Sequence, residues 1–508
     1  MKSKNKKKVV DGSRDLISGL PDAMLCHILS FLPTKEAAST TALAKRWRPL
    51  LAFVPNLDFD DSIFPHPRES ESVMAFVDNV LALQENATLK RFHLKCKDVV
   101  DGYRVLDWLP KVLKRDVLDI DLHIPSPCGF CSKSSFYPPL PSEIFVSKTL
   151  VRLKIQFKNG VSINVEGDVS LPNLKTLHLD SFKIDTRMFN KLLSGCHVLE
   201  ELVLVKLMWD ESVEPGTCFV TVSIPTLKRL LFSRFQYFDE DEDSVEATDF
   251  NESVSFSFHN SNLVYLKYSD TIAGRYQQVS FDSLVEAKLK LRKTSGQTEK
   301  DKVNVTKLLM GICNVKILYL SYFTLKVLGC CSETMPIFEN LIQLTIKTAL
   351  DVGWESLPPV LNNCPNLQTL VFDGLHHKYT VKCGDEEGCV CEGQDDFGVE
   401  EDINTCLSSS PVKVIKIFNF GEICYVEEDI DDQIKQVIQF LETMPNLEQV
   451  IVYYNTPNDE DVMELCKQLQ ELPKVGSAKC EVQIISDIPN LSCTISMRKA
   501  TPFLVSQP

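Results

Sequence analysis

A pair of cysteines is the first group in the chain whose types and spacing could do chemistry. Cys128 and Cys131 stand in a CxxC arrangement, as paired thiolates do when they hold zinc, and His123 lies close to them. A structural zinc site needs four ligands, however, and no second CxxC pair follows this one. We therefore interpret the pair as two independent thiols in a loop.

A second group of potential metal ligands is denser but less regular. Cys383, Cys389 and Cys391 follow His376 and His377. These side chains are of the types that zinc prefers, whereas C-x5-C-x-C is not the spacing of a standard zinc finger. We predict no metal here. An unrecognised site in this segment, which would make the chain an enzyme, stays open as an alternative.

No other catalytic arrangement is recognisable in the sequence. It lacks a P-loop, a dinucleotide-binding glycine fingerprint and a nucleophile elbow. Its Ser, His and Asp residues are abundant but follow no catalytic order. We therefore predict a protein that is not an enzyme and binds no cofactor.

The composition narrows the class of protein further. The 508 residues are 44% hydrophobic and 24% charged, as in a folded protein with more than one domain. The net charge of −15 argues against nucleic acid as a partner, and no apolar run approaches the roughly 18 residues of a membrane helix. The 18 cysteines are scattered rather than set in a regular framework, which favours reduced thiols in the nucleus and/or cytoplasm. We expect no membrane partner and no secretory signal.

One template recurs along most of the chain: an apolar residue, two others, a second apolar residue, one other, and a third apolar residue. Its copies start at Leu89, Val117, Leu150, Leu174, Leu199, Leu227, Leu263, Leu284, Val315, Leu341, Leu367, Val412 and Leu447. The intervals from Leu150 to Leu227 and from Val315 to Leu367 are 24 to 28 residues, a period typical of leucine-rich repeats, in which alternate side chains of a short strand point inward. No single repeat can bury its face alone, so neighbours must stack.

Segments between these copies predict the connections. FNKLLSGCHVLEEL and VLNNCPNLQTL indicate helices that end at Gly-Cys or before Pro, and we expect helices or long loops to return the chain. Two inserts, FDEDEDSVEATD and the acidic stretch 376–405, break the period. We interpret both as exposed loops; a contact surface for a basic partner is the alternative.

A small helical module precedes the repeats. Pro21 suits the first position of a helix, and Leu32-Pro33 ends it. Along this helix the apolar residues form a wide stripe: Met24, Leu25, Ile28, Leu29 and Leu32. Such a stripe exceeds what a bundle of about forty residues buries, which implies a protein partner.

The second half of the module predicts two more short helices. Thr34 can cap the first of them. Leu43, Trp47 and Leu50 then follow at i, i+4 and i+7, so we expect the indole to pack inward with the leucines. The basic residues of KRWR then lie away from that row. We interpret them as solvent-exposed residues around Trp47 and not as contacts to phosphate.

The stretch LPDAMLCHILSFLPTKEAASTTALAKRWRPLL closely resembles the F-box motif in the form found in large plant families. LPNLKTLHLDSFKID and LLSGCHVLEELVL resemble the leucine-rich repeats of one subfamily. CPNLQTLVFDGL, SSSPVKVIKIFNFGE and FLETMPNLEQVIVYY resemble its FBD domain. The chain as a whole is thus similar to F-box/FBD/LRR-repeat proteins.

The resemblance implies an α/β fold with an N-terminal three-helix F-box. A leucine-rich-repeat solenoid, an irregular horseshoe with a parallel sheet, then leads to a C-terminal FBD strand-helix-strand cap. The expected boundaries are a basic disordered tail over 1–13, the F-box over 14–60, repeats over 85–375, an acidic Cys-rich insert over 376–405, the FBD domain over 406–490 and a tail over 491–508. The first segment contains MKSKNKKK, whose five lysines could instead form a nuclear-import signal; this is the alternative interpretation.

The resemblance also implies a function. F-box proteins bind a Skp-type adaptor, which links them to cullin in an SCF ubiquitin ligase, and the repeats are expected to choose a protein substrate that the sequence does not name. Motif positions that face the adaptor match Leu20, Pro21, Ile28, Leu29, Leu32 and Pro33, and Leu43 and Trp47 match positions that support the bundle or extend the contact. Spacing alone does not separate core from interface at Leu25, Leu43 and Trp47. Pro49 should kink or end the third helix. A non-degradative scaffold is the alternative function.

Overall fold

The computed structural model describes residues 17, 19–60, 70–84, 87–97, 100–125, 139–165, 167–210, 218–234, 254–293, 299–329, 331, 334–349, 357–376, 406–421, 430–454, 480–486 and 493–496. The chain divides into two compact units. Unit 1 comprises Met1–Ile184, Lys191–Leu199 and Leu207–Trp209, and unit 2 comprises Asp185–Asn190, Glu200–Lys206 and Asp210–Pro508. Both cysteine motifs, the tail over 1–13 and nearly all of the insert over 376–405 lie outside the described residues. Within the described ranges, no three His, Cys, Asp or Glu side chains are grouped to hold a metal, and no helix is long and apolar enough to cross a membrane.

The chain begins with a bundle of short helices. They are α1 (Asp22–Leu29), α2 (Thr34–Ser39) and three 3₁₀ turns, η1 (Thr40–Ala42), η2 (Lys45–Trp47) and η3 (Leu50–Phe53). Helices α1 and α2 start where the sequence predicted, but Pro21 and Pro33 occupy the N-cap positions just before them. The expected cap by Thr34 is wrong, because Thr34 is the first residue of α2 and makes no side-chain cap bond. The third predicted helix is present as 3₁₀ turns and not as a continuous α-helix, because Ala44 is extended, with φ −158° and ψ 154°, and Pro49 has no N–H to donate.

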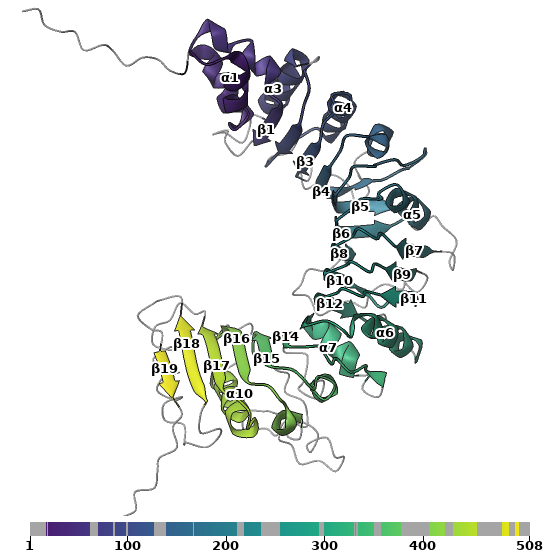
Figure 1. Cartoon of the computed structure of the whole chain (residues 1–508), viewed down its shortest axis with the longest axis vertical. Coiled ribbons are helices and arrows are strands. Elements are labelled where there is room, and N and C mark those ends of the chain that lie inside the picture. The colour runs from purple at the N-terminus through teal and green to yellow at the C-terminus, as the bar shows by residue number, and fades with distance from the viewer. Residues whose placement is uncertain are drawn as a thin grey trace, which may run out of the picture. The chain divides into compact units, whose positions relative to one another are not determined.

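Unit 1 continues with parallel strands. They are β1 (Asn56–Asp60), β2 (Arg91–Lys95), β3 (Asp119–Ile124), β4 (Arg152–Ser162) and β5 (Thr176–Ile184), each paired with the next. The connections hold α3 (Ser70–Leu83), α4 (Gly102–Leu113) and the turn η5 (Ser142–Val146) (Figure 1). Since β1 pairs with β2, the parallel sheet begins about thirty residues before residue 85, where the repeats were expected to start.

The remaining strands of the repeats lie mainly in unit 2. They follow the order β6 (Glu201–Trp209), β8 (Arg229–Arg234), β10 (Tyr265–Thr271), β12 (Glu286–Arg292), β13 (Ile317–Leu320), β14 (Gln343–Lys347), β15 (Thr369–Asp373), β16 (Val414–Phe420), β17 (Gln449–Tyr454) and β18 (Glu481–Ser486). The α-helices of the connections are α5 (Thr186–Ser194), α6 (Glu299–Ile312), α7 (Tyr322–Gly329), α8 (Pro358–Leu361) and α10 (Ile430–Thr443). Two elements are divided between the units, because Leu207–Trp209 of β6 and residues 191–194 of α5 belong to unit 1. The α/β class and the parallel repeat strands are thus confirmed.

A second sheet occupies part of unit 2, where helices or loops were expected. Its parallel strands run in the order β11 (Arg275–Ser280), β9 (Ser255–His259) and β7 (Phe219–Val222), and Figure 1 shows them beside β12, β10 and β8. Their sequences, such as SFSFH, alternate apolar and polar residues, which favours strands over helices. The ring of Phe256 packs against those of Phe232 and Tyr268, at centroid distances of 5.5 and 6.2 Å, and so joins the two sheets.

Each predicted apolar triplet is buried between its neighbours. In unit 1, Ile120 aligns with Leu153 and Leu153 with Leu177, and all three are core residues. The same holds in unit 2, where Leu344 aligns with Leu370. The period of the template therefore predicted both the strand positions and the residues that form the core.

An asparagine just before the first apolar position stabilises several repeats. Asn173, Asn262, Asn366 and Asn446 each donate a side-chain N–H to a backbone carbonyl 25 to 37 residues earlier, at 2.7 to 3.0 Å. The bond satisfies a carbonyl between strands that would otherwise need water. Sequence reasoning missed this role, although the recurring Asn-Leu pair was its signal.

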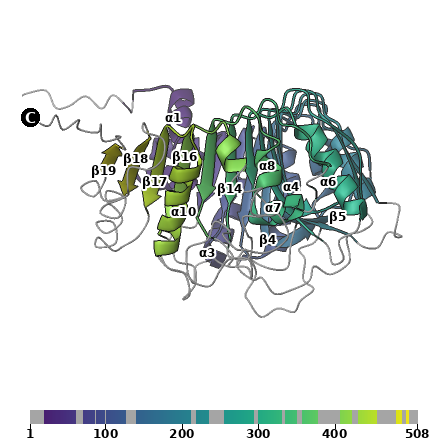
Figure 2. The same cartoon turned by 90° about the horizontal axis from the view of Figure 1, so that it is seen from below.

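The C-terminal strand-helix-strand unit has the expected elements. Ile434, Val437 and Leu441 of α10 are buried, and Phe440 stacks on Phe372 of β15 at 5.3 Å between ring centroids. Figure 2 shows α10 beside β16 and β17. Residues 493–496 were expected to belong to a tail, but they form β19 (Cys493–Ser496), which pairs antiparallel with β18.

Candidate adaptor-binding surface

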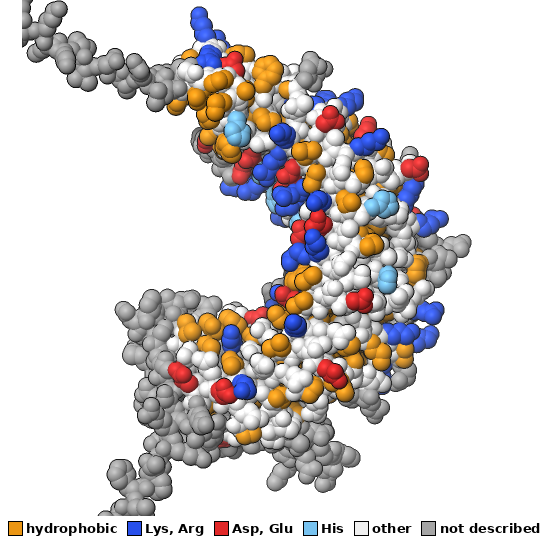
Figure 3. All heavy atoms as spheres, viewed as in Figure 1, with side chains coloured by type: hydrophobic (Ala, Val, Ile, Leu, Met, Phe, Trp, Pro, Cys, Tyr) orange, Lys and Arg blue, Asp and Glu red, His pale blue; other side chains and the backbone are white. Residues whose placement is uncertain are grey.

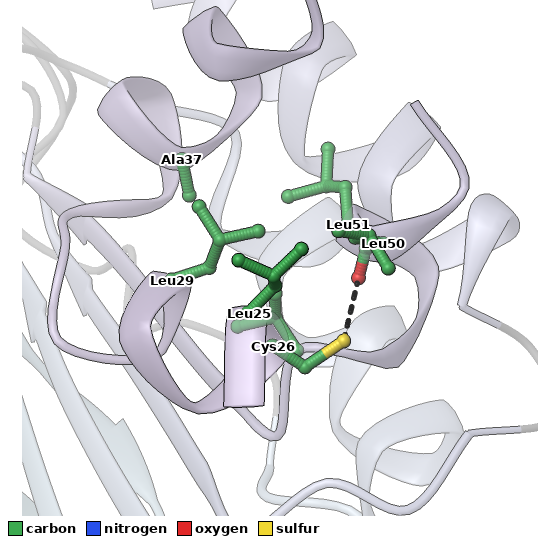
Figure 4. Packing of buried hydrophobic residues seen from close by; sticks show 7 residues of the cluster. Leu25, Cys26, Leu29, Ala37, Leu50 and Leu51 are labelled. Carbon is green, nitrogen blue, oxygen red and sulfur yellow. Dashed lines mark hydrogen bonds between the residues drawn. The ribbon is translucent and has the colours of Figure 1, made fainter. Parts of the chain in front are cut away.

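The helical bundle has a compact apolar core. Its buried members are Leu25, Cys26, Leu29, Ala37, Leu50, Leu51 and Val54 (Figure 4). The partly buried Leu20, Leu32, Ala38 and Trp47 pack against them. The Cys26 thiol lies 3.6 Å from the carbonyl oxygen of Leu50, which joins α1 to η3. Burial, followed by the charge of Asp22, raises the pKa of this thiol, as expected for a cysteine that packs in a core.

The opposite side of α1 and the turn that follows it, which contains Phe31, carry apolar residues that the bundle does not bury. Met24, Ile28 and Phe31 are 55%, 44% and 73% exposed and follow at i, i+4 and i+7, so they form one row, here called the outer stripe. Phe31 makes an edge contact with the His27 ring at 4.9 Å between centroids. Hydrophobic side chains are visible over this bundle in Figure 3. Exposed apolar residues at such spacing are typical of a surface that another protein covers.

The structure separates the predicted adaptor residues into three groups. Ile28, Pro21 and Leu43 are exposed, and Leu20, Leu32, Pro33 and Trp47 are half-buried. Leu29 is only 1% exposed, so its expected adaptor contact does not fit: it faces the core together with Leu25. Leu43 was expected to pack inward with Trp47, yet it is 75% exposed, because the extended Ala44 interrupts the helical row.

Sequence reasoning also missed apolar residues on the surface of the bundle. Phe31 and Phe53 are exposed, and Met24 was expected only as part of a wide stripe. The sequence of α1 did indicate apolar residues on its surface, because they cover a wider part of the helix than the buried row of Leu25 and Leu29. For Phe53, which ends a 3₁₀ turn, helical spacing gave no indication of exposure.

Arg46 connects the start of α1 to the second half of the bundle through side-chain hydrogen bonds. Its guanidinium donates to the Asp22 carboxylate at 2.6 Å and to the backbone carbonyl of Leu20 at 2.6 Å. The expectation that this basic residue is only solvated is therefore wrong. The pair is exposed to solvent, so its electrostatic stabilisation is modest, about 0.2–1 kcal/mol. Its clearer effect is to fix the Leu20-Pro21 entry to α1.

The bundle is bonded to the first repeats within unit 1. The Asp58 backbone N–H of β1 donates to the Thr34 hydroxyl at 2.7 Å. The Gln84 amide, after α3, donates to the carbonyl of Leu51 at 2.5 Å, and Arg115 donates to the Gln84 amide oxygen at 2.9 Å. These bonds connect the bundle to β1 and to the segments that precede β2 and β3.

Each strand of the repeats also has an open face, the side whose residues alternate with the buried ones. In unit 1 its charges alternate in sign across neighbouring strands. Asp119 lies 3.6 Å from Arg91 and 3.7 Å from Arg152, on opposite neighbours. The same pattern joins Asp58 to His93 at 2.6 Å, Asp60 to Lys95 at 3.3 Å and Asp121 to Lys154 at 3.9 Å.

Comparison with known proteins gives the family. A model of the F-box domain matches residues 17–56, and a model of the LRR repeats of the FBD-associated F-box protein At5g56370 matches residues 106–250. The F-box/LRR-repeat proteins At4g00320 and At5g41840 of Arabidopsis thaliana are 65% and 61% identical, over 96% and 97% of this chain and 99% of each relative. The F-box/FBD/LRR-repeat protein At3g59240 of the same plant is 46% identical over 93% of this chain and 90% of its own length. The chain therefore belongs to the F-box/LRR-repeat family.

Proposed function

We propose that the protein is the substrate-recognition subunit of an SCF-type ubiquitin ligase. The F-box and the repeats make it a protein-interaction adaptor, and the outer stripe supports the finer assignment. Ile28 and its neighbours on α1 would bind a Skp-type adaptor and, through it, cullin. A protein substrate would bind the repeats. Such a subunit needs no catalytic group, because it raises the effective concentration of the substrate near the conjugating enzyme.

The outer stripe has enough apolar surface to support this contact. Met24, Ile28 and Phe31 are each about half exposed or more, and complete burial of such a side chain contributes about 1.5–3 kcal/mol. Even part of that sum, added to the contacts of Pro21 and Leu43, would be significant for a binding surface of standard size. The buried thiols of the described residues also support the assignment to the nucleus and/or cytoplasm, which imaging of a fluorescent fusion would test.

Co-purification with a Skp-type adaptor tests the proposal. The Ile28→Asp and Phe31→Asp changes place charge on the outer stripe without touching the core, and we expect them to weaken adaptor binding at least about tenfold. Leu20→Ala with Pro21→Ala should weaken it through the entry to α1. Tyr103→Asp is the matched control, because this exposed aromatic residue lies on α4, away from the bundle core.

Two results would overturn the proposal. One is the failure of the unchanged protein to bind the adaptor, and the other is binding that none of the stripe variants alters. Proteasome inhibition then separates a ligase subunit from a non-degradative scaffold. A substrate captured by the repeats should accumulate, whereas the abundance of a scaffold partner should not change.

A further inference from the structure

The open face of unit 2 carries a cluster of cations on two neighbouring strands. Lys267 of β10 and Lys288, Lys290 and Arg292 of β12 occupy alternate positions, so their side chains share this face. We call these four residues the basic patch. On the open face of these two strands, the described carboxylate is Glu286, which lies 3.3 Å from Lys288. Among the described residues of β10 and β12, the open face thus carries four cations and one carboxylate, in a chain whose net charge is −15.

The arrangement of the patch works against folding. Lys267 aligns directly with Lys288 in the parallel register of β10 and β12. Like charges at neighbouring positions of paired strands repel and destabilise the sheet. The strands of unit 1 avoid this arrangement, because Asp119 and Asp121 lie beside cations of the next strand. A like-charged pair at the corresponding place in unit 2 is therefore a cost that a bound anion would offset.

Aromatic rings hold the cations in place. The guanidinium of Arg292 lies over the Phe323 ring at 3.9 Å from its centroid, and the Lys290 ammonium lies 5.9 Å from the same centroid. Lys288 is 5.8 Å from the centroid of Tyr265. Cation–π contacts of this kind restrict side chains that would otherwise sample many rotamers. The patch is thus preorganised to bind, which lowers the entropic cost of recognition.

The ring of Phe323 is itself fixed by backbone contacts. It lies in the first turn of α7, where the Thr324 hydroxyl donates to the carbonyl of Leu289 at 3.0 Å and accepts from the backbone N–H of Leu291 at 2.8 Å. These bonds replace strand pairing beyond the end of β13, which is shorter than β12. As a result, α7 places Phe323 at the end of the open face of β12.

We propose that the basic patch binds an acidic, extended segment of the protein substrate, an inference that rests on the proposed function and names its substrate class. The charge of the patch selects a negatively charged ligand. Its geometry selects an extended chain: alternate residues of β12 are roughly 6.6 Å apart, which is also the spacing of alternate side chains in an extended peptide. Acidic side chains at every second position would meet Lys288, Lys290 and Arg292 in turn. The nearby Glu286 and the acidity of the whole chain disfavour nucleic acid.

Fluorescence anisotropy with the purified full-length protein tests this proposal. The probes are a short peptide that alternates Glu with Val, its Gln counterpart and a single-stranded DNA of similar length. We expect the Glu peptide to bind more tightly than the other two probes and to weaken as salt rises. Lys288→Gln with Lys290→Gln should reduce its affinity about tenfold, as the loss of two ion pairs predicts.

The matched control is Lys95→Gln with Lys154→Gln. These lysines lie on the open face of unit 1 beside carboxylates, so their loss should leave peptide binding unchanged. If the double variant in the patch fails to fold, Lys267→Gln makes the same test with a single exposed residue. Equal binding of the Glu and Gln peptides, preference for DNA, or equal effects of patch and control variants would overturn the proposal.

The adaptor assay on the same samples separates this proposal from the function on which it rests. If patch variants lose the peptide but keep the adaptor, both ideas are supported. If the protein binds the Glu peptide but no adaptor, the patch stands and the ligase assignment fails. If it binds the adaptor and does not prefer the Glu peptide, the ligase assignment stands and the patch fails.

Discussion

On the open face of unit 1, Asp119 lies between two arginines of neighbouring strands, whereas in unit 2 Lys267 lies directly beside Lys288. The same strand template builds both faces. In unit 1 opposite charges meet across each of the strand pairs β1–β2, β2–β3 and β3–β4. In unit 2 the corresponding positions of β10 and β12 are mostly cationic. The repeat therefore sets where open-face side chains lie but leaves their charge free to vary.

The difference has an energetic meaning. Neighbouring opposite charges on a sheet contribute roughly 0.2–1 kcal/mol, and like charges cost a similar amount. The open face of unit 1 consequently stabilises its own fold and has little charge left for a ligand. The basic patch lacks part of the stabilisation that opposite charges would contribute, as is common where a surface is adapted to binding. Changes of charge should thus have opposite consequences in the two units.

The largest expected effect concerns charge on the core face of β10, beneath the basic patch. Asp270 is paired there with Arg234, and the two side chains are only 1% and 7% exposed. Burial raises the pKa of the Asp270 carboxyl, and Arg234 opposes this rise. We predict that Asp270→Asn lowers the free energy of unfolding by about 3–5 kcal/mol, because it leaves a buried guanidinium without its carboxylate. Urea denaturation measures this change.

Two controls make this prediction specific to buried charge. Asp121→Asn removes a carboxylate from the open face of unit 1 and should cost less than about 1 kcal/mol. Replacing both partners, by Asp270→Leu with Arg234→Met, should recover much of the lost stability. If Asp270→Asn were no more destabilising than Asp121→Asn, the distinction between core face and open face would fail.

The next effect is expected when unit 1 is given the charge pattern of unit 2. Asp119→Lys places a cation between Arg91 and Arg152, so two attractive pairs become two repulsive ones. We expect a loss of about 1–2 kcal/mol in the free energy of unfolding, measured by denaturation at low salt. Asp107→Lys, on an exposed position of α4, should change stability by less than about 0.5 kcal/mol. Equal effects at the two sites would show that alternation contributes nothing.

These faces also show how far the sequence could predict the molecule. The apolar period predicted β5, β6 and β14 and their buried residues, because burial on one face needs a regular pattern. The open face has no such requirement, so nothing in the spacing revealed that Lys267 would lie beside Lys288. That neighbour relation depends on register between distant segments.

The adaptor surface was predictable to a similar degree. The motif located the bundle, but spacing could not decide between core and surface: Leu25 is buried and Leu43 is exposed. The reason at Leu43 is a local break in the helix at Ala44, which no hydrophobic period reports. The second sheet of unit 2 was missed because its strands are short and do not carry the apolar template of the repeats.

A smaller effect of opposite sign is expected when unit 2 is given the pattern of unit 1. Lys267→Glu would set a carboxylate beside Lys288 and remove a like-charged pair. We predict that the free energy of unfolding rises by about 0.5 kcal/mol, while affinity for the acidic peptide falls. Thermal unfolding and anisotropy on the same samples measure both. Lys228→Glu, which would break an exposed pair with Glu200, should not stabilise the protein. A loss of stability in the Lys267 variant would remove the argument that the patch costs folding energy.

The smallest expected effect is the pH dependence of the pair between Asp58 and His93 in unit 1. The hydrogen bond from His93 Nδ1 to the carboxylate raises the pKa of this imidazole, and the charges of Asp58 and Asp121 add to the rise, against burial and Arg91. A raised pKa means that the folded state binds the proton more tightly, so this contribution to stability is fully present below about pH 6.5, the ordinary value for histidine. It is lost as pH rises through the higher pKa of the folded state. We predict that the free energy of unfolding decreases by a few tenths of a kcal/mol over that window, because the pair is partly exposed.

An NMR titration of His93 tests this prediction. Asp58→Asn should lower the pKa of His93, whereas Asp60→Asn, whose partner is Lys95, should leave it nearly unchanged. An unchanged pKa of His93 in the Asp58 variant would show that Asp58 and His93 do not interact as an opposite-charge pair on this face.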